Sequence, residues 1–350
     1  MYTKVYKTAV PKRNKASIED VARRARVSIT TVSRVINNVP TVSKKNQTKV
    51  EEAVAFLKYT PDVNAQRLAR GLNNAIGLVM PGYPGIFYSF YAVELIRGVG
   101  HACETQRLDM VFHITNGYNQ INTNSVGGII FADIIENKKQ VEAAIESGMP
   151  CMVINNVVDD LDTNFIAIDN EEGGKVAADY LVSLGHTRIA TITGNIQTQA
   201  GAQRLEGFKR FLLKSKIEFP DEYVREGDYS RRSARIAAEK LLSLPKPPTA
   251  IFSASDDMAL ETITVINEKG LKVPDDISVI GFDDNPSSIY GLVALTTVRQ
   301  PLFEMAEMSV KYLNNIILGK KKSLVHKILS PQLVVRESCS GPSKVRFSVI

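Results

Sequence analysis

From about Asn74 to residue 318, short apolar runs alternate with longer amphipathic stretches. Short runs of apolar and β-branched residues are typical of strands, and apolar residues that recur every three or four positions are typical of helices. Strands are expected at Ala75–Met80, Met110–Ile114, Val126–Phe131, Cys151–Ile154, Phe165–Ile168, Arg188–Thr193, Tyr223–Glu226, Ala250–Ala254 and Ile277–Phe282. Helices are expected near 87–104, 137–147, 171–184, 202–214, 231–243, 256–269 and 302–318. This alternation favours a parallel α/β architecture, and the number of strands suggests two sheets.

The segment before this body has a helical pattern only. Ser17, Ser28 and Ser43 can each cap a short helix, because a serine hydroxyl accepts a hydrogen bond from a free N–H of the first turn. The expected apolar faces are Ile18, Val21, Ala22 and Ala25; Val32, Val35 and Ile36; and Val50, Val54 and Leu57. The first two helices form a helix-turn-helix unit, and the third closes an all-α, three-helix core. A generic helical bundle is the alternative.

The second helix carries polar side chains outside its apolar stripe. Hydroxyl and guanidinium groups there suit the base edges and phosphates of a DNA major groove. The residues expected to contact DNA in this region are Ser28, Ile29, Thr30, Thr31, Ser33, Arg34 and Asn37.

A further short helix can begin at Pro61 and end at Gly71. It is too short to be stable alone in water, but a segment of this kind can fold on DNA. Its expected DNA contacts are Asn64, Arg67, Leu68 and Arg70. Leu68 can wedge between base steps in the minor groove; alternatively it packs against the body or against the same segment of a partner.

The charge distribution agrees with a DNA-binding N-terminus. Residues 1–72 contain 15 Lys and Arg against 5 Asp and Glu, whereas the rest contains 28 against 32. A basic segment on an acidic body is expected of a module that binds a polyanion, although a solvated basic tail would look similar.

Two N-terminal motifs carry a resemblance to the LacI/GalR family of bacterial regulators. They are Ile18-x-Asp20-Val21-Ala22-x-x-Ala25-x-Val27-Ser28-x-x-Thr31-Val32-Ser33-Arg34-Val35-Ile36-Asn37 and Tyr59-x-Pro61-x-x-x-Ala65-x-x-Leu68. The resemblance implies that Ile29 and Thr30 read bases, that Arg34 makes a further base contact, and that Leu68 opens the central base step together with its counterpart. It also implies a homodimer, or a tetramer, on a palindromic operator.

The body resembles the periplasmic-binding-protein-like core of that family. The matching motifs are Asp169-Asn170-x-x-Gly173-Gly174, Leu184-Gly185-His186-x-x-Ile189-Ala190, Arg204-Leu-x-Gly207-Phe208, Pro247-x-x-Ala250-Ile251-Phe252, Asp256-x-Met258-Ala259, Ile280-Gly281-Phe282-Asp283 and Leu295-Thr296-Thr297-Val298-x-Gln300-Pro301. The resemblance implies two lobes joined by three chain crossings, near 166–170, 296–300 and 327–331.

The expected organisation is a tail (1–16), a headpiece (17–60), a hinge helix and linker (61–72), an effector-binding and dimerisation domain (73–338) and a second tail (339–350). Lobe 1 is expected to comprise about 73–167 and 299–328, and lobe 2 about 168–298 and 329–338.

Ligands of open α/β sheets bind beyond the carboxyl ends of the strands, which places an effector between the lobes. The resemblance gives Asn155, Arg204, Ser255 and Asp283 as effector contacts and Tyr229 as a stacking residue; Phe87 and Tyr88 are additional candidates. Carboxylate, amide and guanidinium groups beside an aromatic ring suit a sugar or polyol.

Each of these residues also has a purely structural interpretation. Asp283 could cap a helix, Arg204 could form a surface ion pair, and Asn155 with Asn156 could form a plain turn. His186 is expected to be structural. Residues 115–125 are polar and lack the helix that the family usually places there, so the local topology of lobe 1 stays open.

Other functions fit less well. Phosphate-binding, dinucleotide and nucleophile-elbow motifs are absent from the sequence, so we expect neither an enzyme nor a cofactor. The three scattered cysteines fit a reducing cytoplasm, and no apolar run suits a membrane span or an export signal. The basic headpiece argues against a solute-binding protein. The expected function is a ligand-controlled DNA-binding regulator, commonly a repressor, with control by a protein partner as the alternative.

Overall fold

A computed structural model describes residues 16–36, 41–59, 73–82, 86–116, 121–134, 137–321 and 323–342. The chain divides into two compact units, Met1–Leu72 and Asn73–Ile350, which we describe separately as the headpiece and the body. The predicted DNA contacts Asn37, Asn64, Arg67, Leu68 and Arg70 lie outside the described residues. Within the described ranges, no helix is long and apolar enough to cross a membrane.

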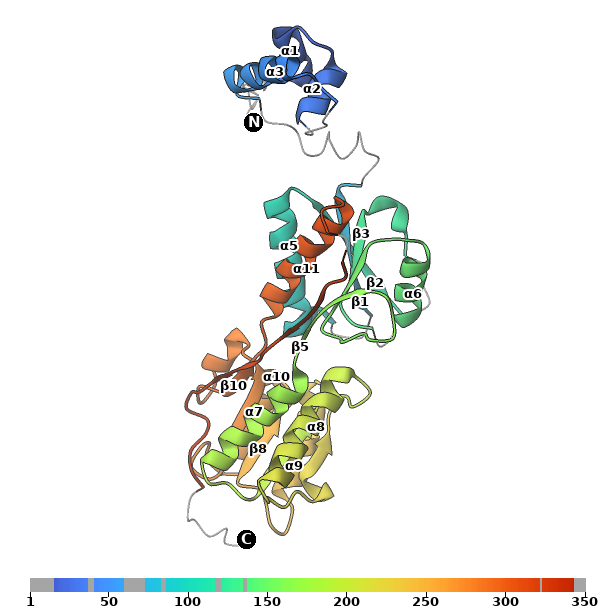
Figure 1. Ribbon diagram of the computed structural model, residues 1–350. Coiled ribbons are helices and arrows are strands. Elements are labelled where there is room, and N and C mark those ends of the chain that lie inside the picture. The colour runs from blue at the N-terminus through green and yellow to red at the C-terminus, as the bar shows by residue number, and fades with distance from the viewer. Residues whose placement is uncertain are drawn as a thin grey trace, which may run out of the picture. The chain divides into compact units, whose positions relative to one another are not determined.

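The headpiece contains α1 (Ile18–Ala25), α2 (Ile29–Ile36) and α3 (Lys44–Leu57), which confirms the predicted three-helix unit (Figure 1). Ser17 begins α1: its hydroxyl accepts the Asp20 N–H at 3.2 Å, and the Asp20 carboxylate accepts the Ser17 N–H at 2.9 Å. This reciprocal pair satisfies two amide groups that the first helical turn leaves free. Val21, Val32 and Val50, one from each helix, are fully buried in the core.

The body contains two six-stranded sheets, as the α/β prediction required. The first has the order β11-β5-β4-β3-β1-β2, and the second has the order β12-β10-β9-β8-β6-β7. We call the structures built on them lobe 1 and lobe 2. The strands of lobe 1 are β1 (Ala75–Pro81), β2 (Asp109–Thr115), β3 (Gly128–Phe131), β4 (Cys151–Ile154), β5 (Asn164–Ile168) and β11 (His326–Leu329). The strands of lobe 2 are β6 (Ile189–Thr193), β7 (Val224–Glu226), β8 (Ala250–Ser253), β9 (Ser278–Asp283), β10 (Thr296–Arg299) and β12 (Gln332–Val334).

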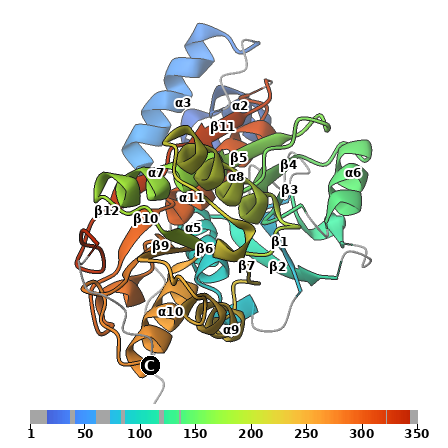
Figure 2. The same cartoon turned by 90° about the horizontal axis from the view of Figure 1, so that it is seen from below.

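Helices cover both faces of each sheet. In lobe 1, α5 (Phe90–Gln106) and α11 (Leu302–Ile317) cover one face, and α6 (Lys138–Glu146) lies on the opposite side (Figure 2). In lobe 2, α7 (Asn170–Ser183) and α8 (Gln199–Lys214) pack on one face, and α9 (Arg231–Leu242) and α10 (Asp256–Glu268) pack on the other. Because both faces are covered, the inner strands of each sheet are apolar and buried rather than alternating, whereas the edge strands β2, β7, β11 and β12 are partly exposed.

The sequence analysis missed three short strands, β10, β11 and β12. The pairing of β10 with β12 is antiparallel, whereas the other pairs are parallel. The chain passes between lobes at Asp169, at Gln300-Pro301 and at Ser330-Pro331, each time directly after a strand. The ends of these strands therefore lie at the junction of the lobes.

The unusually short connection in lobe 1 joins β2 to β3. Its described residues contain a single 3-10 turn, Thr123–Ser125, in place of a full helix. Val126 is buried, and Ile121 packs on the same cluster as Val79 of β1, so these side chains cover part of the sheet face that a helix would cover. The Asn73 amide donates to the carbonyls of Asn124 (2.8 Å) and Val126 (3.1 Å) and fixes the connection to the start of β1.

Candidate functional site

The exposed side of α2 is the candidate DNA-binding surface. Ser28 begins this helix, and its hydroxyl accepts the Thr31 N–H at 3.1 Å. The predicted contacts that fall in the described ranges divide into exposed residues (Ser28, Ile29, Thr30 and Arg34) and half-buried ones (Thr31 and Ser33). Ile29 is 47% exposed, which is unusual for isoleucine and leaves its side chain accessible to a thymine methyl group.

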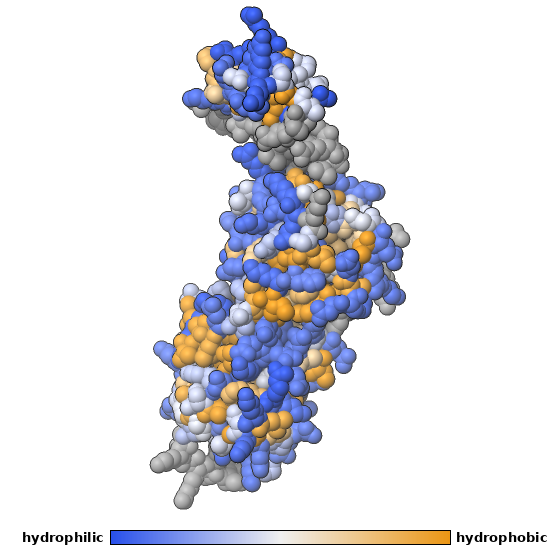
Figure 3. Space-filling view, viewed as in Figure 1, coloured by the Kyte–Doolittle hydropathy of each residue, from blue (hydrophilic) through white to orange (hydrophobic). Residues whose placement is uncertain are grey.

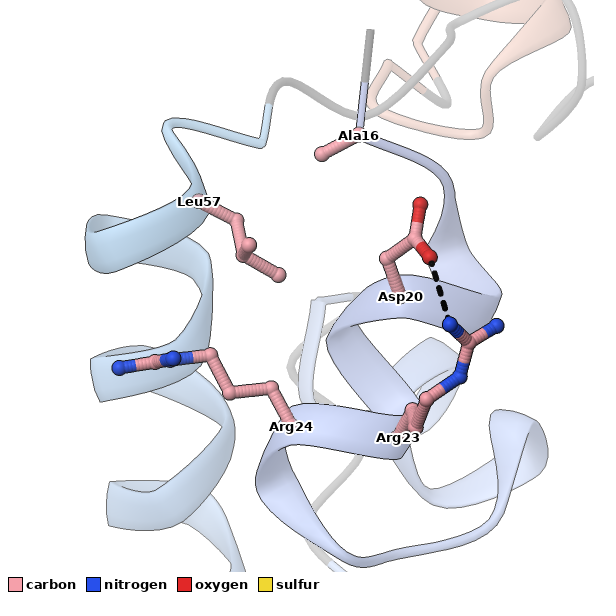
Figure 4. Close-up of a pocket in the computed structure, with 5 residues that line it drawn as sticks. All are labelled: Ala16, Asp20, Arg23, Arg24 and Leu57. Carbon is pink, nitrogen blue, oxygen red and sulfur yellow. Dashed lines mark ion pairs between the residues drawn. The ribbon is translucent and has the colours of Figure 1, made fainter. Parts of the chain in front are cut away.

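A depression in the headpiece lies between α1 and α3 and does not involve α2 (Figure 4). It is lined by Ala16, Asp20, Arg23, Arg24 and Leu57. Arg23 pairs with Asp20 at 3.5 Å, and the Arg24 guanidinium lies 3.2 Å from the centroid of the Phe56 ring. Both cations therefore have partners within the headpiece, and the depression lies apart from the predicted DNA contacts on α2.

In the body, Arg204 of α8 is buried among polar groups of lobe 2. Its guanidinium donates to Asn170 Oδ1 at 2.9 Å, to the Ala254 carbonyl at 2.7 Å and to Gln300 Oε1 at 3.3 Å, and it lies 3.6 Å from the centroid of the Phe282 ring. An arginine has five N–H donors, so the remaining ones can serve a ligand. The surface ion-pair interpretation of Arg204 is wrong, since the side chain is 3% exposed.

Asp283, the last residue of β9, is close to this guanidinium. Its carboxylate accepts a short hydrogen bond from the Gln300 amide. Burial raises the pKa of Asp283 to about 7, although Arg204 and the Gln300 bond act in the opposite direction. Asp256 is also buried, and both burial and the Asp283 charge raise its pKa. Asp256 accepts from Thr297 Oγ1 at 2.6 Å and from the Asn285 N–H at 2.7 Å.

Backbone strain is concentrated at the same place. Among the described residues, eight that are not glycine have a positive φ: Arg26, Lys58, Arg107, Lys216, Asn155, Tyr229, Asp283 and Asp284. Arg26, Lys58 and Arg107 are the C-caps of helices, and Lys216 is one residue beyond the C-cap of α8; the left-handed conformation is common at such positions. Of the other four, Asn155, Tyr229 and Asp283 are predicted effector contacts, and Asp284 directly follows Asp283. Strained backbone persists where the surrounding structure imposes it, and it is frequent at ligand sites.

Tyr229 lies against the backbone of Gly194, which directly follows β6. The Tyr229 hydroxyl is 3.4 Å from Thr198 Oγ1. Burial raises the pKa of Tyr229, and the nearby Arg204 charge acts in the opposite direction. A Cβ atom on Gly194 would overlap the tyrosine ring. The glycine therefore makes the space that the ring occupies.

We expect Gly194→Ala to displace the Tyr229 ring and to lower the free energy of unfolding of the body by about 1–3 kcal/mol, the usual cost of overpacking. The matched control is Gly100→Ala in the middle of α5, where an added Cβ meets nothing within 4 Å. That control should stabilise the body by roughly 0.5–1 kcal/mol, since alanine has the higher helix propensity. Urea unfolding followed by circular dichroism compares the two; equal stabilities would contradict the close packing of Tyr229.

The remaining predicted contacts differ in where they lie. Asn155 follows β4 in lobe 1; its side chain is buried, and its Oδ1 has no hydrogen-bond partner among the described residues. Ser255 caps α10 by accepting the Met258 N–H at 3.4 Å and keeps a hydroxyl proton to donate. Phe87 packs on Phe112, with ring centroids 5.9 Å apart, and Tyr88 is 91% exposed. The described contacts connect neither aromatic residue with the Arg204 network.

His186 has a structural role, and two further polar residues belong to the site although the sequence analysis did not select them. His186 is buried and bonds Thr249 Oγ1 at 2.9 Å and the Ser340 carbonyl at 2.8 Å, as a structural histidine does. The sequence analysis did not select Asn170 or Gln300 as site residues, although both stand in motifs that it quoted. In the part of the chain that the structure describes, no group of three His, Cys, Asp or Glu could hold a metal ion.

Comparisons with known proteins match both units. Residues 17–62 match the family model described as bacterial regulatory proteins, lacI family, and residues 178–339 match a periplasmic binding protein-like domain. The chain is 36% identical to the probable HTH-type transcriptional repressor ExuR of Bacillus subtilis, over 92% of this chain and 98% of that protein. It is 32% identical to the HTH-type transcriptional repressor PurR of Vibrio campbellii, over 92% and 98% of the two chains.

Solved structures agree with these matches. A lac repressor dimer bound to operator and the anti-inducer ONPF is 29% identical, with a TM-score of 0.69 over 93% of this chain and 100% of that chain. A complex of the transcriptional regulator CelR with cellobiose is 27% identical, with a TM-score of 0.68 over 92% and 99% of the two chains.

Proposed function

The chain belongs to the LacI family of DNA-binding transcriptional regulators, and we propose that the effector controlling it is a sugar or sugar derivative bound between the two lobes. Proteins of this family regulate transcription and are not enzymes. The observation that carries the proposal is twofold. On one lobe, the buried Asn155 Oδ1 receives no hydrogen bond from the residues that the structure describes; on the other lobe lies the Arg204 and Asp283 network.

The chemistry of these groups suits hydroxyls. Asn155 Oδ1 and the Asp283 carboxylate accept hydrogen bonds, and the remaining N–H groups of Arg204 donate them. A buried acceptor without a donor costs free energy. A ligand hydroxyl that donates to Asn155 Oδ1 removes this cost, so ligands with a hydroxyl at that position bind more tightly than ligands without one. Tyr229 offers a ring face to the apolar side of a sugar. The structure of the relative CelR with cellobiose is consistent with such a ligand.

On the DNA side, we propose that two headpieces bind a palindromic operator. The α2 residues Ile29, Thr30 and Arg34 would read bases in the major groove, with Ser28, Thr31, Ser33 and Asn37 beside them. The segment with Asn64, Arg67, Leu68 and Arg70 would order in the minor groove, where Leu68 would open a base step. This activity would take place in the cytoplasm, where the operator is.

A homodimer is the assembly that we propose. Figure 3 shows apolar residues at the surface of both lobes. In lobe 2, Ile289, Tyr290 and Leu292 are exposed together, at 50%, 81% and 79%. Clustered exposed apolar side chains of this kind mark interaction surfaces. The relative with operator and ONPF is a dimer, which supports a second copy of this chain as the occupant.

We propose that DNA binding is controlled by the position of one lobe relative to the other, which we call the pose of the lobes. An effector that binds one pose better than another shifts the population toward that pose and so changes the separation of the two hinge segments in a dimer. By linkage, the factor by which the effector changes DNA affinity equals the factor by which DNA changes effector affinity.

Selection of bound sequences from random duplex DNA tests this function. The purified full-length protein is used with and without fractions of a sugar library. A palindrome whose affinity shifts with one fraction supports the proposal. A palindrome that no fraction shifts would contradict sugar control and favour a protein partner. Failure to enrich any sequence would contradict the DNA-binding assignment of α2.

Arg34→Ala should weaken binding to the selected palindrome by roughly 1–3 kcal/mol and relax base preference at one position in each half-site. Arg34→Lys is the matched control, because it keeps the charge and loses the two-pronged guanidinium. We expect the lysine variant to lose base preference but to keep most non-specific affinity in a fluorescence anisotropy titration. Full base preference in both variants would show that Arg34 does not read a base.

A further inference from the structure

One side chain joins the two lobes directly. Gln199, the first residue of α8 in lobe 2, donates from Nε2 to the Val157 carbonyl at 3.0 Å, and its Oε1 accepts the Val157 N–H at 2.7 Å. Val157 follows β4 in lobe 1. A single amide therefore satisfies both backbone groups of a residue in the opposite lobe, in the way that a neighbouring strand would. We call this pair of bonds the clasp.

Both ends of the clasp are anchored in the framework of their lobes. Gln199 follows Thr198, whose hydroxyl caps α8 by accepting the Gly201 N–H at 3.0 Å and donates to the Asn195 carbonyl at 2.7 Å. On the other side, Val157 lies between two buried residues: Asn156, which accepts the Ile134 N–H at 3.1 Å, and Val158 in the lobe 1 core. Because these contacts tie each end to its own lobe, the clasp constrains the position of one lobe relative to the other.

The clasp is next to the proposed effector site and separate from the three chain crossings. Val157 is two residues after Asn155, and Gln199 begins the helix that carries Arg204. The two lobe surfaces that would bind the effector from opposite sides are thus linked through a pair of hydrogen bonds that the chain makes itself.

We propose that Gln199 is a positioning residue that ties lobe 2 to lobe 1 and sets the separation between Asn155 and Arg204. This inference rests on the proposed function, in which an effector binds between the two lobes. The clasp limits how far the lobe surfaces that carry Asn155 and Arg204 can move apart.

Hydrogen exchange of the Val157 amide tests the clasp without any effector. Within residues 156–162, the described hydrogen bonds use the N–H of Val157 alone, so a peptide covering this segment reports on that bond. Gln199→Met keeps the length of the side chain and removes both bonds. We expect exchange at Val157 to accelerate about tenfold, a factor equivalent to ~1.4 kcal/mol of opening free energy.

Two further variants sharpen this measurement. Gln199→Glu should accelerate exchange less than the methionine variant, because a carboxylate oxygen still accepts the Val157 N–H while the other oxygen faces the Val157 carbonyl. Gln203→Met on the same helix is the matched control; the described hydrogen bonds do not involve the Gln203 side chain, and exchange at Val157 should stay as in the unmodified protein. Unchanged exchange in Gln199→Met would overturn the proposal, as would equal acceleration in the control.

The distance between the lobes is a second measurement, and it would not change if Gln199 had only a local structural role. Nitroxide labels at Glu146→Cys in lobe 1 and Lys214→Cys in lobe 2, both exposed positions, report the distance between lobes by electron–electron double resonance. We expect a broader distribution in Gln199→Met than in Gln203→Met, and identical distributions would refute the positioning role. Neither experiment contains an effector, so the two proposals can fail independently. A negative result for the clasp does not contradict a palindrome whose affinity depends on a sugar. Absence of that palindrome does not contradict a positive result for the clasp.

Discussion

Arg204→Met is expected to abolish the effector response and to lower the free energy of unfolding of the body by roughly 3–5 kcal/mol, the range for removing one member of a buried charged network. The substitution leaves Asn170 Oδ1, the Ala254 carbonyl and Gln300 Oε1 without their donor. It also removes the positive charge that counteracts the raised pKa of Asp283. Both effects arise in the network that we assign to the effector.

The matched control is Arg210→Met on the same helix. Arg210 is exposed and pairs with Glu171 at 2.7 Å, so its loss should change stability by less than about 1 kcal/mol. Urea unfolding measures both variants, and anisotropy with operator DNA measures the effector response. The headpiece has its own core around Val21, Val32 and Val50, so DNA binding itself should survive in both. A normal effector response in Arg204→Met would remove Arg204 from the site.

Much of the fold could be predicted because local patterns encode it. The serine at position 17 and the valines at 21 and 32 specify helix starts and buried faces within a few residues of each other, and the headpiece follows from them. The short strands β10 and β12 carry no such pattern. They contain polar residues such as Thr296 and Gln332, and they are strands because β9 offers an edge to β10, and β10 in turn offers one to β12.

The candidate site is harder to predict from the sequence, because its geometry depends on contacts between residues that are far apart in the chain. Resemblance selected Arg204 and Asp283, and the structure buries both side chains. Gln300 connects them, but it lies 96 residues from Arg204 in the chain. Gln199 bonds a residue 42 positions away, and nothing in the neighbouring sequence shows which distant residue either glutamine contacts. Conversely, Phe87 and Tyr88 looked suitable by type and position, yet the described contacts place them outside the Arg204 network.

The raised pKa of Asp283 gives the body a distinctive dependence on pH. A carboxyl group whose pKa is higher in the folded than in the unfolded chain binds more protons when folded, so it stabilises the fold at low pH. That contribution is complete below the unfolded value near 4 and is lost as the pH rises through about 7. Asp256 contributes in the same direction, because burial and the Asp283 charge both raise its pKa.

Asp283→Asn is therefore expected to flatten the decline in unfolding free energy between pH 5 and pH 8, since Asp283 no longer titrates and its charge no longer raises the pKa of Asp256. Effector affinity should fall by roughly 10–100-fold, because ligand hydroxyls lose a charged acceptor. In the unmodified protein the affinity should rise as the pH passes through about 7, where the carboxyl group ionises. Urea unfolding and effector titrations at several pH values measure these changes, with the exposed Asp159→Asn as control. A variant that keeps the pH profile of the unmodified protein would show that another group controls it.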